Sequence, residues 1–152
     1  MLCAFRRVPQ LDEPADRVNA ARQQTLTILV VEDDPLSRVS IASYLRDVGY
    51  RVLEAGDAEE AISALSSGSR IHLVFSDVAL PGAMGGFSLA VWIRNHFRPI
   101  PVILTSGVGS AILPLVRQHL VPFLQKPYRP QEAAELIATV LESSPFVKNL
   151  GR

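Results

Sequence analysis

Five short apolar runs, rich in β-branched residues, constrain the fold of this chain more than any other feature of its sequence. The runs cover residues 27–31, 50–55, 71–76, 100–106 and 121–125. Each gap between neighbouring runs has room for one helix, and strands that alternate with helices are typical of βαβ units. The first, third and fourth runs are almost continuous Val, Ile and Leu, which indicates strands buried on both faces of a parallel sheet.

Helix boundary signals mark the gaps between the runs. Asp34 followed by Pro35 predicts an N-cap with proline at the first helical position, and Gly49 predicts the end of that helix. The gap after the fourth run contains two glycines and a proline, so we expect its helix to be the least stable. The sequence therefore predicts a doubly wound α/β fold of flavodoxin-like topology, with a five-stranded parallel sheet of order 2-1-3-4-5 and helices on both faces.

The predicted domain leaves a short segment at each end of the chain. Residues 1–25 are polar and lack a strong apolar period, so we expect a mobile N-terminal extension or one weak helix. Residues 26–142 carry the five units, and residues 143–152 form a C-terminal tail that is too short for an effector domain. We therefore expect a domain that acts without an attached output domain.

Composition and charge exclude several classes of function. Lys and Arg number 15, as do Asp and Glu, so the formal net charge is zero. Domains that bind nucleic acid through its phosphates are usually strongly basic. Because this chain is neutral, we expect no direct binding to nucleic acid. No apolar run has the length of a membrane span, and Cys3 is the single cysteine. These features predict a cytoplasmic protein without an internal disulfide or a membrane anchor.

Polar side chains stand at the ends of four of the five runs. Glu32 and Asp33 follow the first run, and Asp77 follows the third. Ser106 ends the fourth run, and Lys126 follows the fifth. In open parallel sheets the functional site lies beyond the carboxyl ends of the strands. We therefore expect these side chains to converge at one edge of the sheet.

Three carboxylates in one pocket require a compensating cation. Two like charges about 4 Å apart repel by roughly 4 kcal/mol at an effective dielectric constant near 20. Because Mg²⁺ prefers carboxylate oxygens, the acidic cluster predicts a magnesium site. Lys126 adds an ammonium that can hold an oxyanion, and Ser106 adds a hydroxyl. Together these groups have the chemistry needed to form an aspartyl phosphate.

Four motifs give the chain a resemblance to the receiver domain of two-component response regulators. They are VVEDDP at residues 30–35, SDVALPGAMGG at 76–86, PVILTSG at 101–107 and QKPY at 125–128. The resemblance extends from about residue 27 to residue 141. Each motif alone is weak evidence, but their order and their common position at strand ends are specific to that family.

The resemblance implies a role for each residue at the strand ends. Asp77 would accept a phosphoryl group from a phosphohistidine on a sensor histidine kinase or a histidine phosphotransfer protein. Lys126 would bind a phosphoryl oxygen. The protein ligands of Mg²⁺ would be Glu32, Asp33, Asp77 and the backbone carbonyl of Ala79. The domain would catalyse only its own phosphorylation and dephosphorylation, so we expect no other enzyme activity.

The resemblance also implies a switch that an unidentified downstream protein reads. Ser106 and Phe123 would be the switch pair, with the hydroxyl moving to the phosphoryl group and the ring turning inward. Ala79 and Val108 would flank the path of the hydrolytic water. The chain departs from the family pattern in having Ser in place of the commoner Thr, Phe where Tyr is frequent, and a GAMGG loop one residue longer than usual.

Other classes of protein share parts of this pattern. A flavodoxin-like flavin carrier needs hydroxyls and backbone amides after its first strand, and Glu-Asp-Asp there would repel the flavin phosphate. A phosphatase with an aspartate nucleophile would need a substrate pocket that the sequence does not indicate. A receiver-like binding module that is never phosphorylated remains the main alternative, although such a module would have no need to keep a repulsive acidic cluster.

Overall fold

The computed structural model describes residues 25–97 and 99–145. Residues 1–24 of the predicted extension, with Cys3, and residues 146–152 of the predicted tail lie outside the described residues. The domain boundaries expected around residues 25 and 142 therefore stay predictions.

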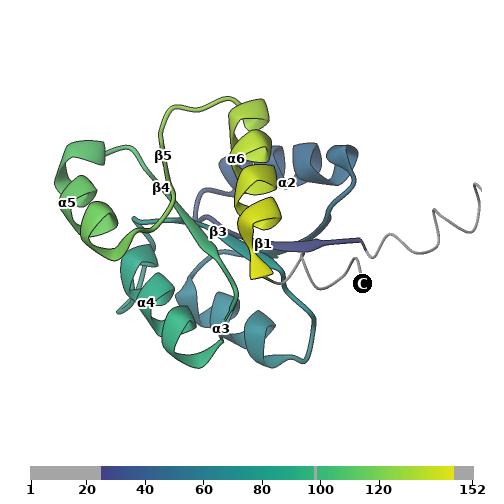
Figure 1. Ribbon diagram of the computed structural model, residues 1–152, viewed down its shortest axis with the longest axis horizontal. Coiled ribbons are helices and arrows are strands. Elements are labelled where there is room, and N and C mark those ends of the chain that lie inside the picture. Colours follow the sequence, from purple (N-terminus) through teal and green to yellow (C-terminus); the bar gives the residue numbers. More distant parts are fainter. Residues whose placement is uncertain (1–24, 98, 146–152) are drawn as a thin grey trace, which may run out of the picture.

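Strands and helices alternate along the described chain in the predicted order (Figure 1). The strands are β1 (Thr27–Val31), β2 (Arg51–Ala55), β3 (Leu73–Asp77), β4 (Val102–Ser106) and β5 (Phe123–Gln125). The helices are α2 (Pro35–Val48), α3 (Ala58–Ser66), α4 (Gly86–His96), α5 (Gly109–His119) and α6 (Pro130–Ser143). Among the described residues, none of the helices combines the length and the apolar character needed to cross a membrane.

The strands form one parallel sheet, and its order β2-β1-β3-β4-β5 confirms the predicted topology. In the register of the sheet, Leu29 of β1 lies between Leu53 of β2 and Val74 of β3. Figure 1 shows α2 and α6 on one face of the sheet and α3 and α4 on the other. All five carboxyl strand ends therefore lie at the same edge of the sheet.

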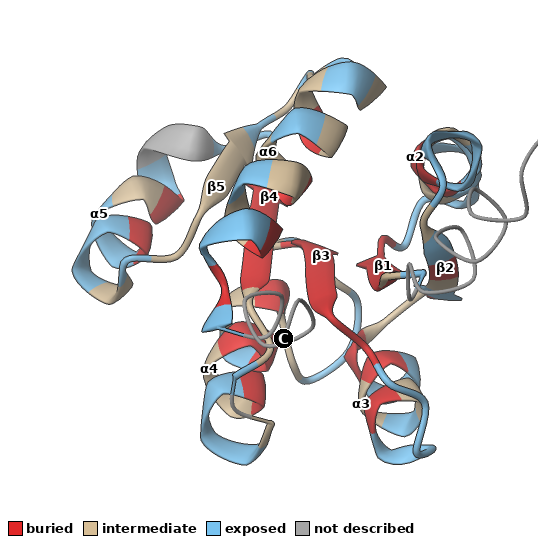
Figure 2. Ribbon diagram, turned by 45° about the vertical axis from the view of Figure 1, so that its right-hand side comes forward, coloured by how far each residue is buried: buried red, intermediate tan, exposed pale blue. Residues whose placement is uncertain are grey.

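Two apolar cores flank the sheet because successive side chains of a strand point to opposite faces. In β1, Leu29 and Val31 belong to the core beneath α3, α4 and α5, whereas Ile28 and Val30 belong to the core beneath α2 and α6. Figure 2 shows β1, β3 and β4 as buried strands and the helices as buried on their inner sides. The almost continuous apolar runs thus mark the central strands, as predicted.

The boundaries of α2 confirm the expected caps. The carboxylate of Asp34 accepts a hydrogen bond from the backbone N–H of Ser37 at 2.8 Å, and Pro35 opens the helix. Gly49 ends it with φ 112°, a left-handed conformation that glycine adopts without steric cost. These caps fix the turn between β1 and α2, which carries the first two acidic residues of the candidate site.

Three strands begin two residues later than their apolar runs. They are β3, β4 and β5, which begin at Leu73, Val102 and Phe123. Just before β3, the buried His72 ring accepts a hydrogen bond from the Thr27 N–H at 2.9 Å.

α5 forms an unbroken helix although Pro114 lies inside it. Its buried residues Ile112 and Val116 pack against the core, and such tertiary packing can override weak helix propensity. The expected low stability of α5 stays a prediction.

Candidate functional site

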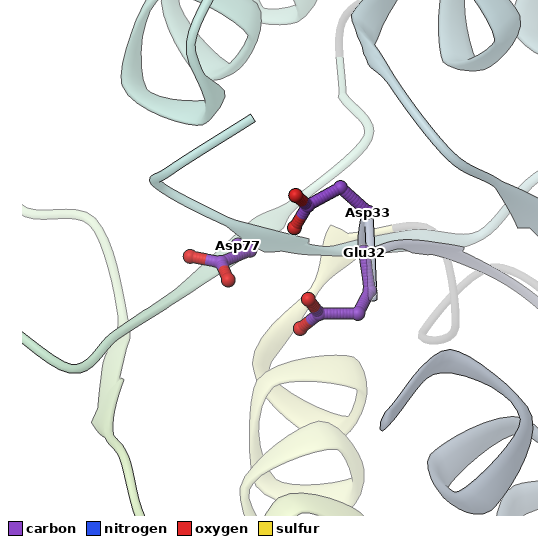
Figure 3. Close-up of side chains that lie close together, drawn as sticks. All are labelled: Glu32, Asp33 and Asp77. Carbon is purple, nitrogen blue, oxygen red and sulfur yellow. The ribbon is translucent and has the colours of Figure 1, made fainter. Parts of the chain in front are cut away.

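The carboxyl ends of β1 and β3 bring three carboxylates together. Val31 lies beside Ser76 in the register, so the residues that follow them, Glu32 and Asp77, lie side by side at the edge of the sheet. Oxygen atoms of Glu32, Asp33 and Asp77 all lie within 4.8 Å of one another. Figure 3 shows the three side chains gathered at this edge. The predicted convergence of these residues is confirmed, whereas their roles stay predictions.

Burial differs among the three carboxylates. Glu32 and Asp77 are 5% and 7% exposed, whereas Asp33 is exposed to solvent. Burial raises the pKa of Glu32 above its ordinary value, and the hydrogen bond from Lys126 opposes that rise. The cluster therefore combines two desolvated carboxylates, which gain most from a nearby cation, with one carboxylate that keeps its contact with water.

Lys126 supplies a cation between the two buried carboxylates. Its ammonium lies 2.7 Å from Glu32 Oε2 and 2.5 Å from Asp77 Oδ2. Burial by itself lowers the pKa of Lys126, but its hydrogen bonds to Asp77 and Glu32 outweigh burial and raise the pKa above its ordinary value. Lys126 therefore stays protonated and offsets the repulsion expected from the sequence. These contacts exclude the interpretation of Lys126 as a solvated surface lysine.

The path of the Lys126 side chain follows from the order of the sheet. Its backbone N–H donates to the carbonyl of Ser106 at 2.9 Å, which places Lys126 beside the end of β4. From there the long side chain crosses the end of β4 to reach the ends of β3 and β1. The peptide bond between Lys126 and Pro127 is cis. Residues far apart in the sequence thus meet because their strands are close in the sheet.

Both carboxylate oxygens of Asp77 have hydrogen-bond donors. The backbone N–H of Ala79 donates to Oδ1 at 2.9 Å, and Lys126 donates to Oδ2. Ala79 itself is exposed at the start of the loop that leads to α4. The carboxylate is therefore held in one orientation by one donor from the loop and one from the residue that follows β5.

The two residues expected to form a switch lie on neighbouring strands. Ser106 ends β4 and is 1% exposed, and its Oγ accepts a hydrogen bond from the Val108 N–H at 3.1 Å. Phe123 begins β5 and is partly buried against the core beneath α3, α4 and α5. The structure thus places Phe123 at the margin of that core.

Arg38 is a residue of the site region that sequence reasoning missed. Its Nη1 donates to the backbone carbonyl of Glu32 at 2.6 Å, and its Nε lies 3.7 Å from Glu54 Oε2 in β2. Arg38 thereby fixes the end of β1 that carries the acidic pair. The sequence around Arg38 does not indicate these partners, because the contacts depend on how α2 lies over the sheet.

Gly86 is a second missed residue, and it touches the backbone of Asp77. A Cβ at Gly86 would lie 2.8 Å from the Asp77 carbonyl carbon and closer still to its oxygen, a distance that real Cβ atoms do not show. The N–H of Gly86 donates to the carbonyl of Val78 at 2.9 Å, which holds the start of α4 against this loop. In the sequence, the pair Gly85-Gly86 at the end of the unusually long loop is the feature that could have indicated a close backbone contact.

An open groove lies beside Lys126. It has a volume of about 550 Å³ and runs between the first turns of α2 and the connection from β5 to α6. Ser37, Ser40, Gly107, Lys126 and Tyr128 contribute to its lining. The groove therefore opens onto the side of Lys126 that faces the first turns of α2.

Sequence comparison connects this geometry with known proteins. A family model described as the response regulator receiver domain matches residues 28–138. The Two-component response regulator ORR3 of Oryza sativa subsp. japonica is 30% identical over 118 residues, which cover 75% of this chain and 89% of that protein. The Nitrogen assimilation regulatory protein NtrX of Azorhizobium caulinodans is 28% identical over 119 residues, which cover 76% of this chain but 26% of that protein.

Structural comparison gives the same relationship. The receiver domain of NtrX from Brucella abortus superposes with a TM-score of 0.70 at 30% identity, covering 77% of this chain and 99% of that chain. A response regulator receiver protein from Sinorhizobium medicae has the same fold, with a TM-score of 0.72 at 22% identity and coverage of 79% and 97%. The matched residues include every strand end that carries a polar residue of the site. The chain therefore belongs to the response regulator receiver domain family.

Proposed function

We propose that this domain is a Mg²⁺-dependent phosphoacceptor in a two-component or phosphorelay system. Asp77 receives the phosphoryl group from a phosphohistidine on a sensor histidine kinase or a histidine phosphotransfer protein. One observation carries the proposal, namely that Lys126 contacts both Glu32 and Asp77 within the acidic cluster. A module without this chemistry would gain nothing from keeping two buried carboxylates around one ammonium.

The donor set of the cluster fits Mg²⁺. Carboxylate oxygens are the ligands that this ion prefers, and the exposure of Asp33 leaves room for the waters that it retains. Glu32, Asp33, Asp77 and the backbone carbonyl of Ala79 would hold the ion. When bound, it would neutralise negative charge on the phosphoryl oxygens as a Lewis acid.

Asp77 provides the nucleophile of the transfer step. One of its carboxylate oxygens forms the new O–P bond while the P–N bond to the partner's histidine breaks, and the bonding electrons return to the imidazole nitrogen. The Ala79 N–H, 2.9 Å from Oδ1, keeps the carboxylate oriented for this displacement. Lys126 moves one of its hydrogen bonds from Asp77 to a phosphoryl oxygen, where it stabilises the charge that the transfer brings in.

The hydroxyl of Ser106 connects the phosphoryl group to α5. In the unphosphorylated domain Ser106 Oγ accepts the Val108 N–H just before α5 begins. A hydroxyl that turns to the phosphoryl group gives up this contact, and Phe123 fills the space behind it. A downstream protein then recognises the altered surface around α5 and β5. The domain catalyses its own phosphorylation and dephosphorylation and no reaction of a separate substrate.

The proposal is tested by incubating the purified chain with acetyl phosphate and measuring its intact mass. We expect a gain of one phosphoryl group in the presence of Mg²⁺ and none after chelation of the metal. A chain that folds and binds Mg²⁺ but gains no phosphoryl group would instead support the alternative of a non-phosphorylated binding module.

Removal of Asp33 should weaken metal binding without disturbing the fold. Asp33 is exposed, so Asp33→Ala removes one oxygen ligand without leaving a cavity. We expect the affinity for Mg²⁺ to fall roughly tenfold or more, since loss of even an outer partner of a metal ligand often costs that much. Isothermal titration calorimetry measures the affinity, and Asp47→Ala, which removes an exposed carboxylate of α2, serves as the control. An unchanged affinity in Asp33→Ala would place the metal elsewhere.

Ala79 and Val108 should make the phosphoryl group long-lived. Both side chains are exposed and apolar, and neither can orient an attacking water by hydrogen bonding. We expect Ala79→Asn combined with Val108→Glu to shorten the phosphoryl lifetime roughly tenfold or more, with uptake retained. Loss of label over time at fixed Mg²⁺ measures the lifetime, and Val48→Glu on α2 controls for the added charge. Equal or slower loss in the double variant would refute this explanation.

A further inference from the structure

A second cavity lies at the opposite edge of the sheet from the acidic cluster. It occupies about 230 Å³ between α4 and the connection from α5 to β5, next to the amino ends of β4 and β5. Its lining is mostly aliphatic, with Arg94 and His119 as its basic side chains. The volume is below the roughly 300–1,000 Å³ of typical small-molecule sites. The cavity therefore suits a side chain of a protein partner better than a cofactor.

Leu120 borders this cavity and occupies a backbone conformation that leucine rarely adopts. It caps the C-terminus of α5 with φ 53° and ψ 40°, the left-handed region in which glycine or asparagine is usually found. Its side chain is 89% exposed, so it contributes almost nothing to the core. A strained backbone position that holds an exposed leucine indicates a use for that side chain outside the domain.

The surroundings of the cavity carry charge of one sign. The residues that line the cavity include Arg94 and His119 and no Asp or Glu, although the whole chain is neutral. α4 ends with Arg94 and His96, and α5 ends with Arg117 and His119. Basic residues also stabilise helix C-termini, so the charge alone has an internal explanation. The cap of α5 explains the conformation of Leu120 but not the choice of an exposed leucine there, which is an independent observation.

We propose that this cavity and Leu120 form a docking surface for an acidic segment of a partner protein that carries an exposed leucine or similar aliphatic side chain. The aliphatic side chain enters the cavity and packs against Leu120, while carboxylates beside it meet Arg94, Arg117 and His119. A nucleic acid would satisfy the positive charge but would leave the apolar lining exposed. The surface lies at the opposite edge of the sheet from Asp77 and is present in the unphosphorylated domain.

The test uses the full unphosphorylated chain and a defined probe. The probe is a fluorescent synthetic peptide with two leucines one helical turn apart among glutamates, and two further peptides replace its leucines by serine or its glutamates by lysine. Binding is measured by fluorescence anisotropy, and its location by amide chemical shifts in NMR spectra. Leu120→Gly and Leu120→Asn remove the side chain, and Leu36→Ala removes a leucine that is 82% exposed on α2 as the control.

We expect the acidic leucine peptide to shift amide signals of α4 and of residues 119–122. Leu120→Gly and Leu120→Asn should weaken binding at least fivefold, and Leu120→Gly should raise the melting temperature because glycine relieves the left-handed strain. The serine and lysine peptides should bind at least fivefold more weakly, and Leu36→Ala should bind like the wild type. The proposal is overturned by absent binding, by equal binding in the Leu120 variants, by tighter binding of a DNA duplex, or by self-association that Leu120→Gly removes.

Discussion

Gly86→Ala is expected to slow phosphoryl uptake about a hundredfold and to lower the free energy of unfolding by about 1–3 kcal/mol. The added Cβ would overlap the carbonyl group of Asp77, so either the phosphoacceptor or the start of α4 must shift. A shift of about 1 Å is enough to misplace a reacting group. Uptake is measured from intact mass over time, at a temperature at which circular dichroism shows that the variant is folded.

Gly56→Ala is the matched control for this prediction. A Cβ at Gly56 would make ordinary contacts of 3.5 Å to the side chains of Arg38 and Glu60. We expect its free energy of unfolding to stay within about 0.5 kcal/mol of the wild type and its uptake to be unchanged. Wild-type uptake in folded Gly86→Ala would show that the close approach to Asp77 does not position the phosphoacceptor.

Lys126→Met is expected to have opposite effects on metal binding and on phosphoryl uptake. Methionine keeps much of the side-chain volume but removes the ammonium that lies 2.7 Å from Glu32 and 2.5 Å from Asp77. Without that charge, the three carboxylates attract a divalent cation more strongly, so Mg²⁺ affinity should rise. Uptake should fall roughly a hundredfold to a thousandfold, since a donor to the transferring group is lost.

Calorimetry and mass measurement on the same preparation separate the two effects of Lys126→Met. Arg129→Met is a suitable control, because Arg129 is a nearby cation whose side chain is 79% exposed and pairs with Glu132. This control should leave both quantities unchanged. A parallel fall of Mg²⁺ affinity and uptake in Lys126→Met would mean that the lysine acts by holding the site together rather than by binding a phosphoryl oxygen.

The architecture could be predicted because two independent patterns agree. The central strands are buried on both faces, so their sequences are continuously apolar, and capping residues such as Asp34 and Gly49 mark where α2 starts and ends. Parallel strands place all their carboxyl ends at one edge, so the polar residues that end them had to converge. The positions of Glu32, Asp77 and Lys126 follow from that topology.

Features that depend on distances between elements could not be predicted. The sequence gives no measure of how close Gly86 comes to the carbonyl of Asp77, or that Arg38 reaches the backbone of Glu32. The start of β3 was misplaced because the buried Ile71 extends the apolar run although it precedes the strand.

The central claim is that Asp77 is the phosphoacceptor, and one measurement tests it most directly. Wild-type chain and Asp77→Asn are incubated side by side with acetyl phosphate and Mg²⁺, and their intact masses are compared. Asparagine has nearly the same shape as aspartate but lacks the nucleophilic carboxylate, so the fold should be kept while the covalent step is lost. The account predicts one phosphoryl group on the wild type and none on Asp77→Asn. A phosphoryl group on folded Asp77→Asn would contradict it.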